Sequence, residues 1–158
     1  MDFEAFTDGL DYPMYVVTVM EGGEQSGCLV GFGSQVSMAP PRFMVCISVT
    51  NHTHEVALRA NLLAVHLLGA EQQALAELFG TETGDDIDKF QRCSWQAGPG
   101  GVPVLDDCPR VLVGRVHARV DLGDHTGIVL DPVSVTACDG DPGLTFKDVE
   151  RLEPGHPA

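Results

Sequence analysis

Apolar and polar residues in the first third of the chain follow the two-residue period of β-strands. Residues 14–20 are β-branched and aromatic, and turn residues follow them at 21–24. A second strand is predicted at residues 26–32, where glycines indicate a bulge or a close approach of another group to the backbone. After the prolines at 40 and 41, residues 42–50 alternate between two unlike faces. This alternation predicts a third strand.

Two short helices are predicted in the middle of the chain. Residues 53–60 have helical character, with Asn51 or Thr53 as the N-cap and an acidic residue in the first turn. Residues 71–79 place apolar side chains at helical spacing, and Gly80 follows at a typical C-cap position. The sequence therefore predicts helical inserts rather than a helical framework.

Further strands are predicted after each helix. Residues 62–68 form an apolar strand, and residues 103–105 form at most a short edge segment. Residues 111–121 alternate between apolar and charged positions, and a turn at Gly123-Asp124 leads into a β-rich run at 126–136. Polar loops are predicted at residues 81–88 and 98–101.

These elements predict a mainly β fold. Six or seven strands with two short helices favour a barrel or sandwich with helical inserts, and the regular strand-helix alternation of a Rossmann fold is absent. The length of 158 residues suits one domain, which we assign to residues 1–138. Residues 139–158 form an acidic, Pro/Gly-rich tail, expected to be poorly packed or to lie across a partner.

Composition narrows the classes of partner. The chain has 23 acidic and 9 basic residues and a formal net charge of −14, which argues against general binding to nucleic acid or to anionic lipid. No apolar run approaches the roughly 18 residues of a membrane span, and the acidic start lacks the features of a signal peptide. Five cysteines without metal-type spacing suggest reduced thiols, so a cytoplasmic location is expected.

The first candidate site is the glycine-punctuated segment at residues 27–37. Glycines let backbone N–H groups approach a planar or phosphorylated ligand, and Ser34, Gln35 and Ser37 add hydroxyl and amide partners. The alternative is a bent strand at a barrel corner.

The second candidate site is the sequence from Asn51 to His54 at the start of the first helix. Unsatisfied N–H groups at a helix N-terminus favour an anion such as phosphate. Capping alone explains Asn51 and Thr53, and on the residues alone we favour it. His52 and His54 lack an obvious third metal ligand, so no metal site is predicted.

The third candidate site is Asp124-His125, after Gly123 at the tip of the late hairpin. Histidine can donate to or accept from a bound cofactor, and Asp124 could fix its tautomer. On spacing alone, an ordinary turn explains these residues as well. His66 lies in an apolar strand, where a hydrogen-bonded core histidine is expected.

Four motifs in this order carry a resemblance. They are Tyr15-Val16-Val17-Thr18, the segment from Ser26-Gly27 to Pro40-Pro41, Asn51-His52-Thr53, and Gly123-Asp124-His125. The chain resembles the flavin reductase-like family, whose members adopt an FMN-binding split β-barrel. The similarity spans residues 6–135.

The resemblance implies a set of cofactor-binding residues. Those along the flavin would be Leu29, Val30, Gly31 and Phe32, continued by Gln35 and Ser37, and those near its phosphate would be Asn51, His52, Thr53 and His54. His125, with Asp124, would lie near the flavin ring as the catalytic pair. Many members carry Thr or Ser where Leu29 and Gly31 stand, and the tail lacks the aromatic-rich final strand common in the family.

The implied function is an NADH- or NADPH-dependent flavin reductase. It would use FMN, with FAD as the alternative, and work as a homodimer with flavin sites at the subunit interface. Reduced flavin would be kept or passed to a partner monooxygenase, while the protein positions the reactants. The alternatives are a flavin-bound oxidoreductase acting directly on an organic substrate and a non-catalytic protein that binds flavin, heme or deazaflavin.

Overall fold

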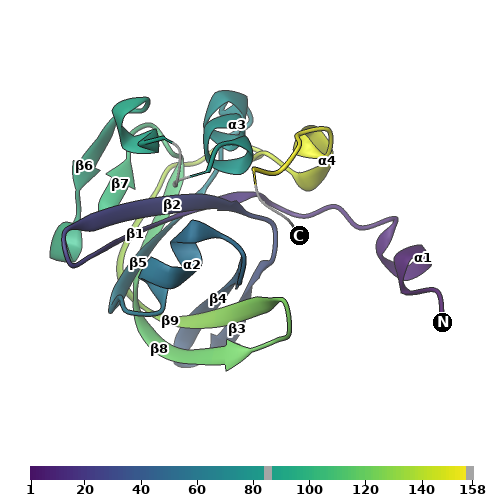
Figure 1. The fold of residues 1–158 in the computed structure, drawn as a ribbon, viewed down its shortest axis with the longest axis horizontal. Coiled ribbons are helices and arrows are strands. Elements are labelled where there is room, and N and C mark those ends of the chain that lie inside the picture. Colours follow the sequence, from purple (N-terminus) through teal and green to yellow (C-terminus); the bar gives the residue numbers. More distant parts are fainter. Residues whose placement is uncertain (84–86, 156–158) are drawn as a thin grey trace.

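One antiparallel sheet of seven strands curls around the core in the computed structural model, which describes residues 1–83 and 87–155 (Figure 1). The strand order is β2-β1-β5-β8-β9-β4-β3. The strands are β1 (Tyr15–Glu21), β2 (Glu24–Val30), β3 (Gly33–Met38), β4 (Pro41–Ser48), β5 (Leu62–Leu67), β8 (Arg110–Asp121) and β9 (His125–Ala137). The sheet edges β2 and β3 are joined by the two-residue link Gly31-Phe32, and this break in the sheet confirms the mainly β, split-barrel expectation.

Short helices and a small hairpin complete the fold. They are α1 (Phe3–Thr7), α2 (His52–Ala57), α3 (Gln73–Thr81), the 3-10 turns η1 (Lys89–Gln91) and η2 (Pro99–Gly101), strands β6 (Trp95–Ala97) and β7 (Pro103–Leu105), and α4 (Phe146–Val149). Helix α1 stands away from the body of the molecule, and α3 and α4 lie on the same side of it (Figure 1). None of the helices in the described part of the chain is long and apolar enough to cross a membrane.

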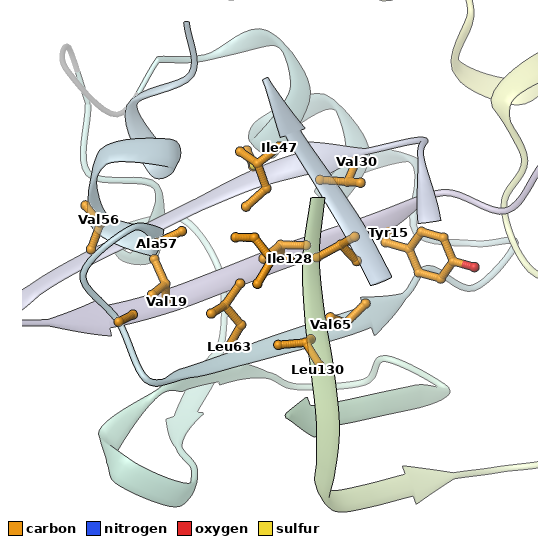
Figure 2. Packing of buried hydrophobic residues seen from close by; sticks show 14 residues of the cluster. Tyr15, Val19, Val30, Ile47, Val56, Ala57, Leu63, Val65, Ile128 and Leu130 are labelled. Carbon is orange, nitrogen blue, oxygen red and sulfur yellow. The ribbon is translucent and has the colours of Figure 1, made fainter. Parts of the chain in front are cut away.

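The main core lies inside the curved sheet. Its buried residues come from β1, β2, β4, β5 and β9, and Val56 and Ala57 of α2 close one side (Figure 2). Ile47, Leu63 and Ile128 are at most 1% exposed. Burying each of these side chains stabilises the fold by roughly 1.5–3 kcal/mol, so the core holds the strands that carry the site residues.

A second core covers the outer face of β1 and β2. Phe79 of α3 and Phe90 of η1 pack there edge to face, with ring centroids 5.7 Å apart. Gly27 allows this packing, because a Cβ at that position would lie 2.7 Å from the Phe79 ring. The glycine that the sequence presented as a ligand-approach position therefore admits a protein side chain.

The predicted strands occur close to their expected places, but the end of helix α3 and the strands β3 and β6 differ from the prediction. Helix α3 continues through Gly80 to Thr81, so Glu82 rather than Gly80 follows it as the C-cap. Strand β3 was not predicted as a separate strand, because its polar residues are mostly exposed and it forms through backbone pairing with β4. The structure confirms Asn51 as the N-cap of α2, one of the two candidates that the sequence offered. Residues 84–86 of the predicted polar loop lie outside the described residues.

The expectation of a poorly packed tail is wrong for the segment that follows β9. Leu144 and Val149 are 2% and 5% exposed and belong to the second core. Thr145 and Asp148 form a capping box at the start of α4. A few well-spaced apolar residues therefore anchor a chain segment that is otherwise acidic and rich in Pro and Gly. The division of the chain into a domain and a tail at residue 138 stays a prediction.

His66 is the hydrogen-bonded core histidine that the sequence predicts. Its side chain is fully buried on β5. Nε2 accepts a hydrogen bond from the Leu105 N–H at 2.9 Å, so the neutral ring carries its proton on Nδ1 and donates it to the Val16 carbonyl at 2.9 Å. The ring thus ties β5 to β1 and β7. Burial lowers the pKa of His66 to about 4.

Candidate functional site

A cavity of about 200 Å³ lies beside the link between β2 and β3. The sequence-predicted residues Leu29, Val30, Gly31 and Phe32 line it, together with Asn51 before α2 and His125 at the start of β9. Segments far apart in the sequence therefore meet at one hollow, because β9 pairs with β4 and the link adjoins β4.

The backbone of the link has N–H groups beside this cavity without a main-chain acceptor among the described residues. The Cys46 N–H donates to the Phe32 carbonyl at 2.8 Å, which fixes the link against β4. Between the described residues, neither the Gly31 nor the Phe32 N–H donates a main-chain hydrogen bond. A polar edge of a planar ligand can use such donors, since exposed N–H groups otherwise bond only to water.

His125 and Asp124 form the close pair that the sequence suggested. His125 Nδ1 lies 2.7 Å from Asp124 Oδ1. An ionised carboxylate only accepts, so Nδ1 donates and the other ring nitrogen stays available for a ligand. The His125 ring packs on Phe32 with centroids 5.1 Å apart. Asp124 is largely exposed, at 76% of its side chain, whereas His125 is 24% exposed.

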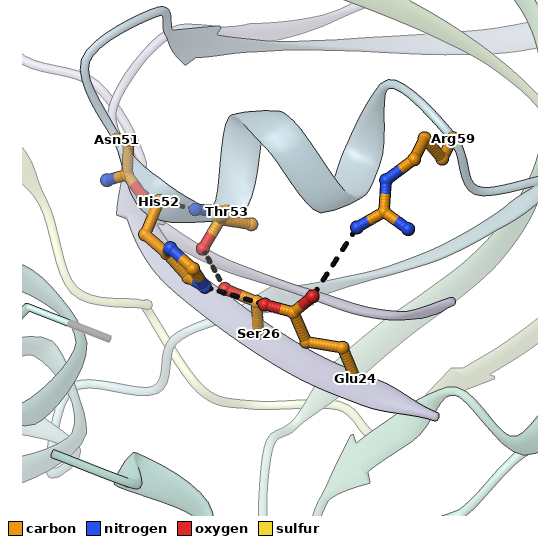
Figure 3. A network of polar contacts seen from close by, with 6 residues as sticks. All are labelled: Glu24, Ser26, Asn51, His52, Thr53 and Arg59. Carbon is orange, nitrogen blue, oxygen red and sulfur yellow. Dashed lines mark hydrogen bonds and ion pairs between the residues drawn. The ribbon is translucent and has the colours of Figure 1, made fainter. Parts of the chain in front are cut away.

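The residues from Asn51 to Thr53 are used mainly within the protein (Figure 3). Asn51 Oδ1 accepts from the Thr53 N–H at 3.0 Å, the capping interaction that the residues alone favoured. The buried Thr53 hydroxyl lies 2.8 Å from the Ser26 hydroxyl. His52 Nε2 lies 2.8 Å from a Glu24 carboxylate oxygen. Of the residues from Asn51 to His54, Asn51 lines the cavity.

Five of the predicted cofactor-binding residues do not line this cavity: Gln35, Ser37, His52, Thr53 and His54. His52 lines a separate hollow of about 460 Å³ between β2 and η1, which Glu24 and the buried Lys89 also line. His54 Nε2 lies 2.8 Å from the Thr126 hydroxyl, and burial lowers the His54 pKa. Gln35 and Ser37 lie on β3, where Gln35 Nε2 donates to the Ser37 carbonyl.

Sequence reasoning missed several residues that line the cavity. Tyr12 precedes β1, Ser48 ends β4, and Phe146 begins α4. Tyr12 and Phe146 stack with ring centroids 4.9 Å apart and an angle of 21° between their planes. Neither residue lies in a periodic segment, and Phe146 falls in the tail that composition marked as loosely packed. Only their contacts in the folded chain identify them.

Known proteins share both the sequence pattern and the fold. The model of the flavin reductase like domain matches residues 7–152. The chain is 34% identical over 131 residues to the NADH:riboflavin 5'-phosphate oxidoreductase of Streptomyces pristinaespiralis, covering 82% of this chain and 72% of that protein. It is 32% identical over 126 residues to the FMN reductase (NADH) RutF 2 of Rhizobium rhizogenes, covering 77% and 72%.

Two solved structures agree with these matches. The Streptomyces globisporus NADH:FAD oxidoreductase SgcE6 superposes with a TM-score of 0.81 at 25% identity, covering 87% of this chain and 81% of that one. A flavin reductase domain protein from Arthrobacter superposes with a TM-score of 0.83 over 99% of this chain and 94% of that one, at 21% identity, which supports the fold. Because the family model covers nearly all of the sequence, the chain belongs to the flavin reductase-like family.

Proposed function

We propose that this chain is an NADH-dependent flavin reductase that uses FMN, with FAD as the alternative flavin. The observation that carries the proposal is the meeting of Leu29–Phe32 with His125 at one cavity, in a chain of this family. Two relatives are named as NADH-dependent reductases of FMN, which is riboflavin 5'-phosphate, and these names support the choice of nucleotide and flavin. NADPH as the donor is an outcome of the tests below.

The residues present fit a flavin. The cavity offers the Gly31 and Phe32 N–H groups, which can donate to the polar edge of the flavin ring, and the aromatic faces of Phe32 and Phe146 beside them. Bound flavin supplies the redox chemistry by accepting hydride from the nicotinamide.

His125 acts in this proposal as the group that orients the nicotinamide or the flavin edge. Asp124 Oδ1 lies 2.7 Å from His125 Nδ1 and accepts its proton in a hydrogen bond, so the ring keeps one tautomer and one orientation. Hydride transfer depends on placement of the two rings more than on a proton shuttle. We therefore assign His125 a positioning role at the reacting rings rather than that of an obligatory acid.

The phosphate end of the flavin is assigned to the Asn51 side of the cavity. Asn51 and Ser48 line this side and carry amide and hydroxyl groups. His52, Thr53 and His54 support the wall from behind in this proposal, because they bond to Glu24, Ser26 and Thr126. The Glu24 carboxylate beside His52 also disfavours a phosphate at that point.

Steady-state NADH oxidation tests the function. If flavin is a substrate, added FMN raises the rate of NADH oxidation by the wild type hyperbolically. His125→Ala should lower kcat/KM for NADH by about tenfold or more, while the Kd for FMN stays within about twofold of wild type. A rate independent of added flavin but dependent on an organic acceptor would instead identify a flavin-bound oxidoreductase. Flavin binding without NADH or NADPH oxidation would identify a carrier. Unchanged NADH kinetics in His125→Ala would remove His125 from the account.

A homodimer is proposed from the exposed apolar residues on the long β8–β9 hairpin. Val120, Leu122, Val133 and Val135 are between 42% and 66% exposed. Val120 and Leu122 lie at the tip of the hairpin, and Val133 and Val135 lie toward its other end. A partner subunit that covers the hairpin along its length would bury both groups. Sedimentation equilibrium of the wild type should give twice the chain mass, and Val135→Glu should lower it. A monomeric wild type would contradict the proposal.

Two further parts of the proposal concern where the product goes. We place the protein in the cytoplasm, on the basis of five cysteines that are all free thiols. Reduced flavin released there would serve a partner monooxygenase. An added flavin-dependent monooxygenase should then form its product at the rate of NADH oxidation. If the reductase retains its flavin, the monooxygenase would form no product.

A further inference from the structure

We propose that Phe146 of α4 is a flavin-contacting residue, through which the C-terminal segment (residues 144–152) reaches the flavin site. This inference rests on the proposed function, because it takes the cavity beside Gly31-Phe32 as the flavin site. Phe146 lines this cavity together with Leu29, Phe32 and His125. Among the described residues that follow β9, Phe146 is the one that lines the cavity.

The segment is held firmly enough to act as a wall. The Phe146 N–H donates to the Tyr12 carbonyl at 2.9 Å, and the Met14 N–H donates to the Leu144 carbonyl at 2.9 Å. Residues 144–146 thus run antiparallel to residues 12–14, with a bridge between Pro13 and Thr145. The Lys147 N–H also donates to an Asp11 carboxylate oxygen at 3.1 Å. These bonds fix the backbone that carries the Phe146 ring.

Tyr12 connects this wall to the link that would lie along the flavin. A Cβ at position 31 would lie 2.7 Å from the Tyr12 ring, so the absence of a side chain at Gly31 admits Tyr12. Tyr12 in turn stacks on Phe146 at 4.9 Å. The space that a side chain at position 31 would fill is thus occupied by an aromatic ring. We infer that aromatic rings provide the contact on this side of the flavin.

Phe146 also separates the cavity from its neighbours. The same side chain lines a hollow of about 260 Å³ toward Gly80 and Leu152, and one of about 440 Å³ toward α1. Phe146 is therefore the partition where three hollows meet. Truncating Phe146 would join the three hollows and admit water to the flavin site. The flavin would lose both the contact with the Phe146 ring and the enclosing wall that the ring provides.

Fluorescence titration of the full chain with FMN and with riboflavin tests the inference. Phe146→Ala should raise both Kd values by about tenfold or more, and by the same factor, because the contact is to the ring system that the two ligands share. Phe146→Leu keeps apolar bulk without a ring, and should raise both values about threefold and alter the visible absorption band of bound flavin. Leu144→Ala is the matched control.

Leu144 lies in the same segment and is more deeply buried, but it does not line the cavity. Its truncation should lower the urea midpoint more than Phe146→Leu does, while flavin Kd stays within about twofold of wild type. Three results would overturn the inference and leave the proposed function intact. They are wild-type flavin affinity in folded Phe146→Leu, a loss of flavin affinity in Leu144→Ala equal to that in Phe146→Ala, and a loss of affinity for FMN alone. A wild type that binds no flavin would overturn both.

Discussion

His66 makes the stability of the fold depend on pH in a way that its geometry specifies. In the folded protein the ring is fully buried and bonded to Val16 and Leu105, and its pKa is lowered to about 4. In the unfolded chain the pKa returns to about 6.5. As the pH falls below about 6.5, His66 binds a proton in the unfolded chain but not in the folded protein, so the free energy of unfolding decreases.

The size of this loss follows from the two pKa values. Between about pH 7.5 and about pH 5, a group with pKa values of about 6.5 unfolded and about 4 folded lowers the free energy of unfolding by about 2 kcal/mol. The loss would approach roughly 3 kcal/mol once pH falls well below 4. Other groups titrate over the same range, so the comparison needs a variant that lacks only this one.

His66→Gln is that variant. Its amide oxygen can still accept from the Leu105 N–H, whereas the Val16 carbonyl loses its donor. We expect a loss of about 1–3 kcal/mol at about pH 7.5 and a dependence on pH that is shallower than wild type by about 2 kcal/mol. Urea unfolding followed by fluorescence of Trp95, which packs on Phe90, measures both. Parallel pH curves for the two proteins would refute the reasoning.

Three other predictions concern single side chains. Gly31→Ala should weaken FMN binding several-fold in a fluorescence titration, because the new Cβ would lie 2.7 Å from the Tyr12 ring and force that ring to move. Lys89→Met should lower the free energy of unfolding by about 2 kcal/mol in urea, because two carbonyls lose their buried ammonium donor. Iodoacetamide at about pH 8 should label exposed Cys138 well before Cys28, since burial blocks access and raises the Cys28 pKa to about 11; peptide mass spectrometry would show equal labelling if this is wrong.

Periodicity predicted the strands well because their burial alternates or is continuous. β1 and β5 are buried along most of their length, so their continuous apolar runs predict them directly from the sequence. β3 was missed because its two apolar residues, Val36 and Met38, are both exposed, so no buried apolar pattern marks the strand. Its existence depends on pairing with β4. Backbone pairing of a polar edge strand leaves little trace in a single sequence.

The site was predicted in part for a similar reason. Leu29 to Phe32, Asn51 and His125 fall in motifs with their own local chemistry, and the fold brings them to one cavity. Gln35 and Ser37 continue the motif in sequence, but they lie on the exposed strand past the link. Phe146 could not be found this way, since its role follows from a long-range contact with Tyr12.

An anaerobic titration of the FMN-loaded protein with NADH, and then with NADPH, tests the central claim most directly. The oxidised flavin absorbance should bleach rapidly with NADH, which would establish hydride transfer to flavin held by this chain. Bleaching by NADPH alone would correct the donor and keep the reductase. If the protein binds FMN and neither nucleotide bleaches it, the proposed reductase function is contradicted.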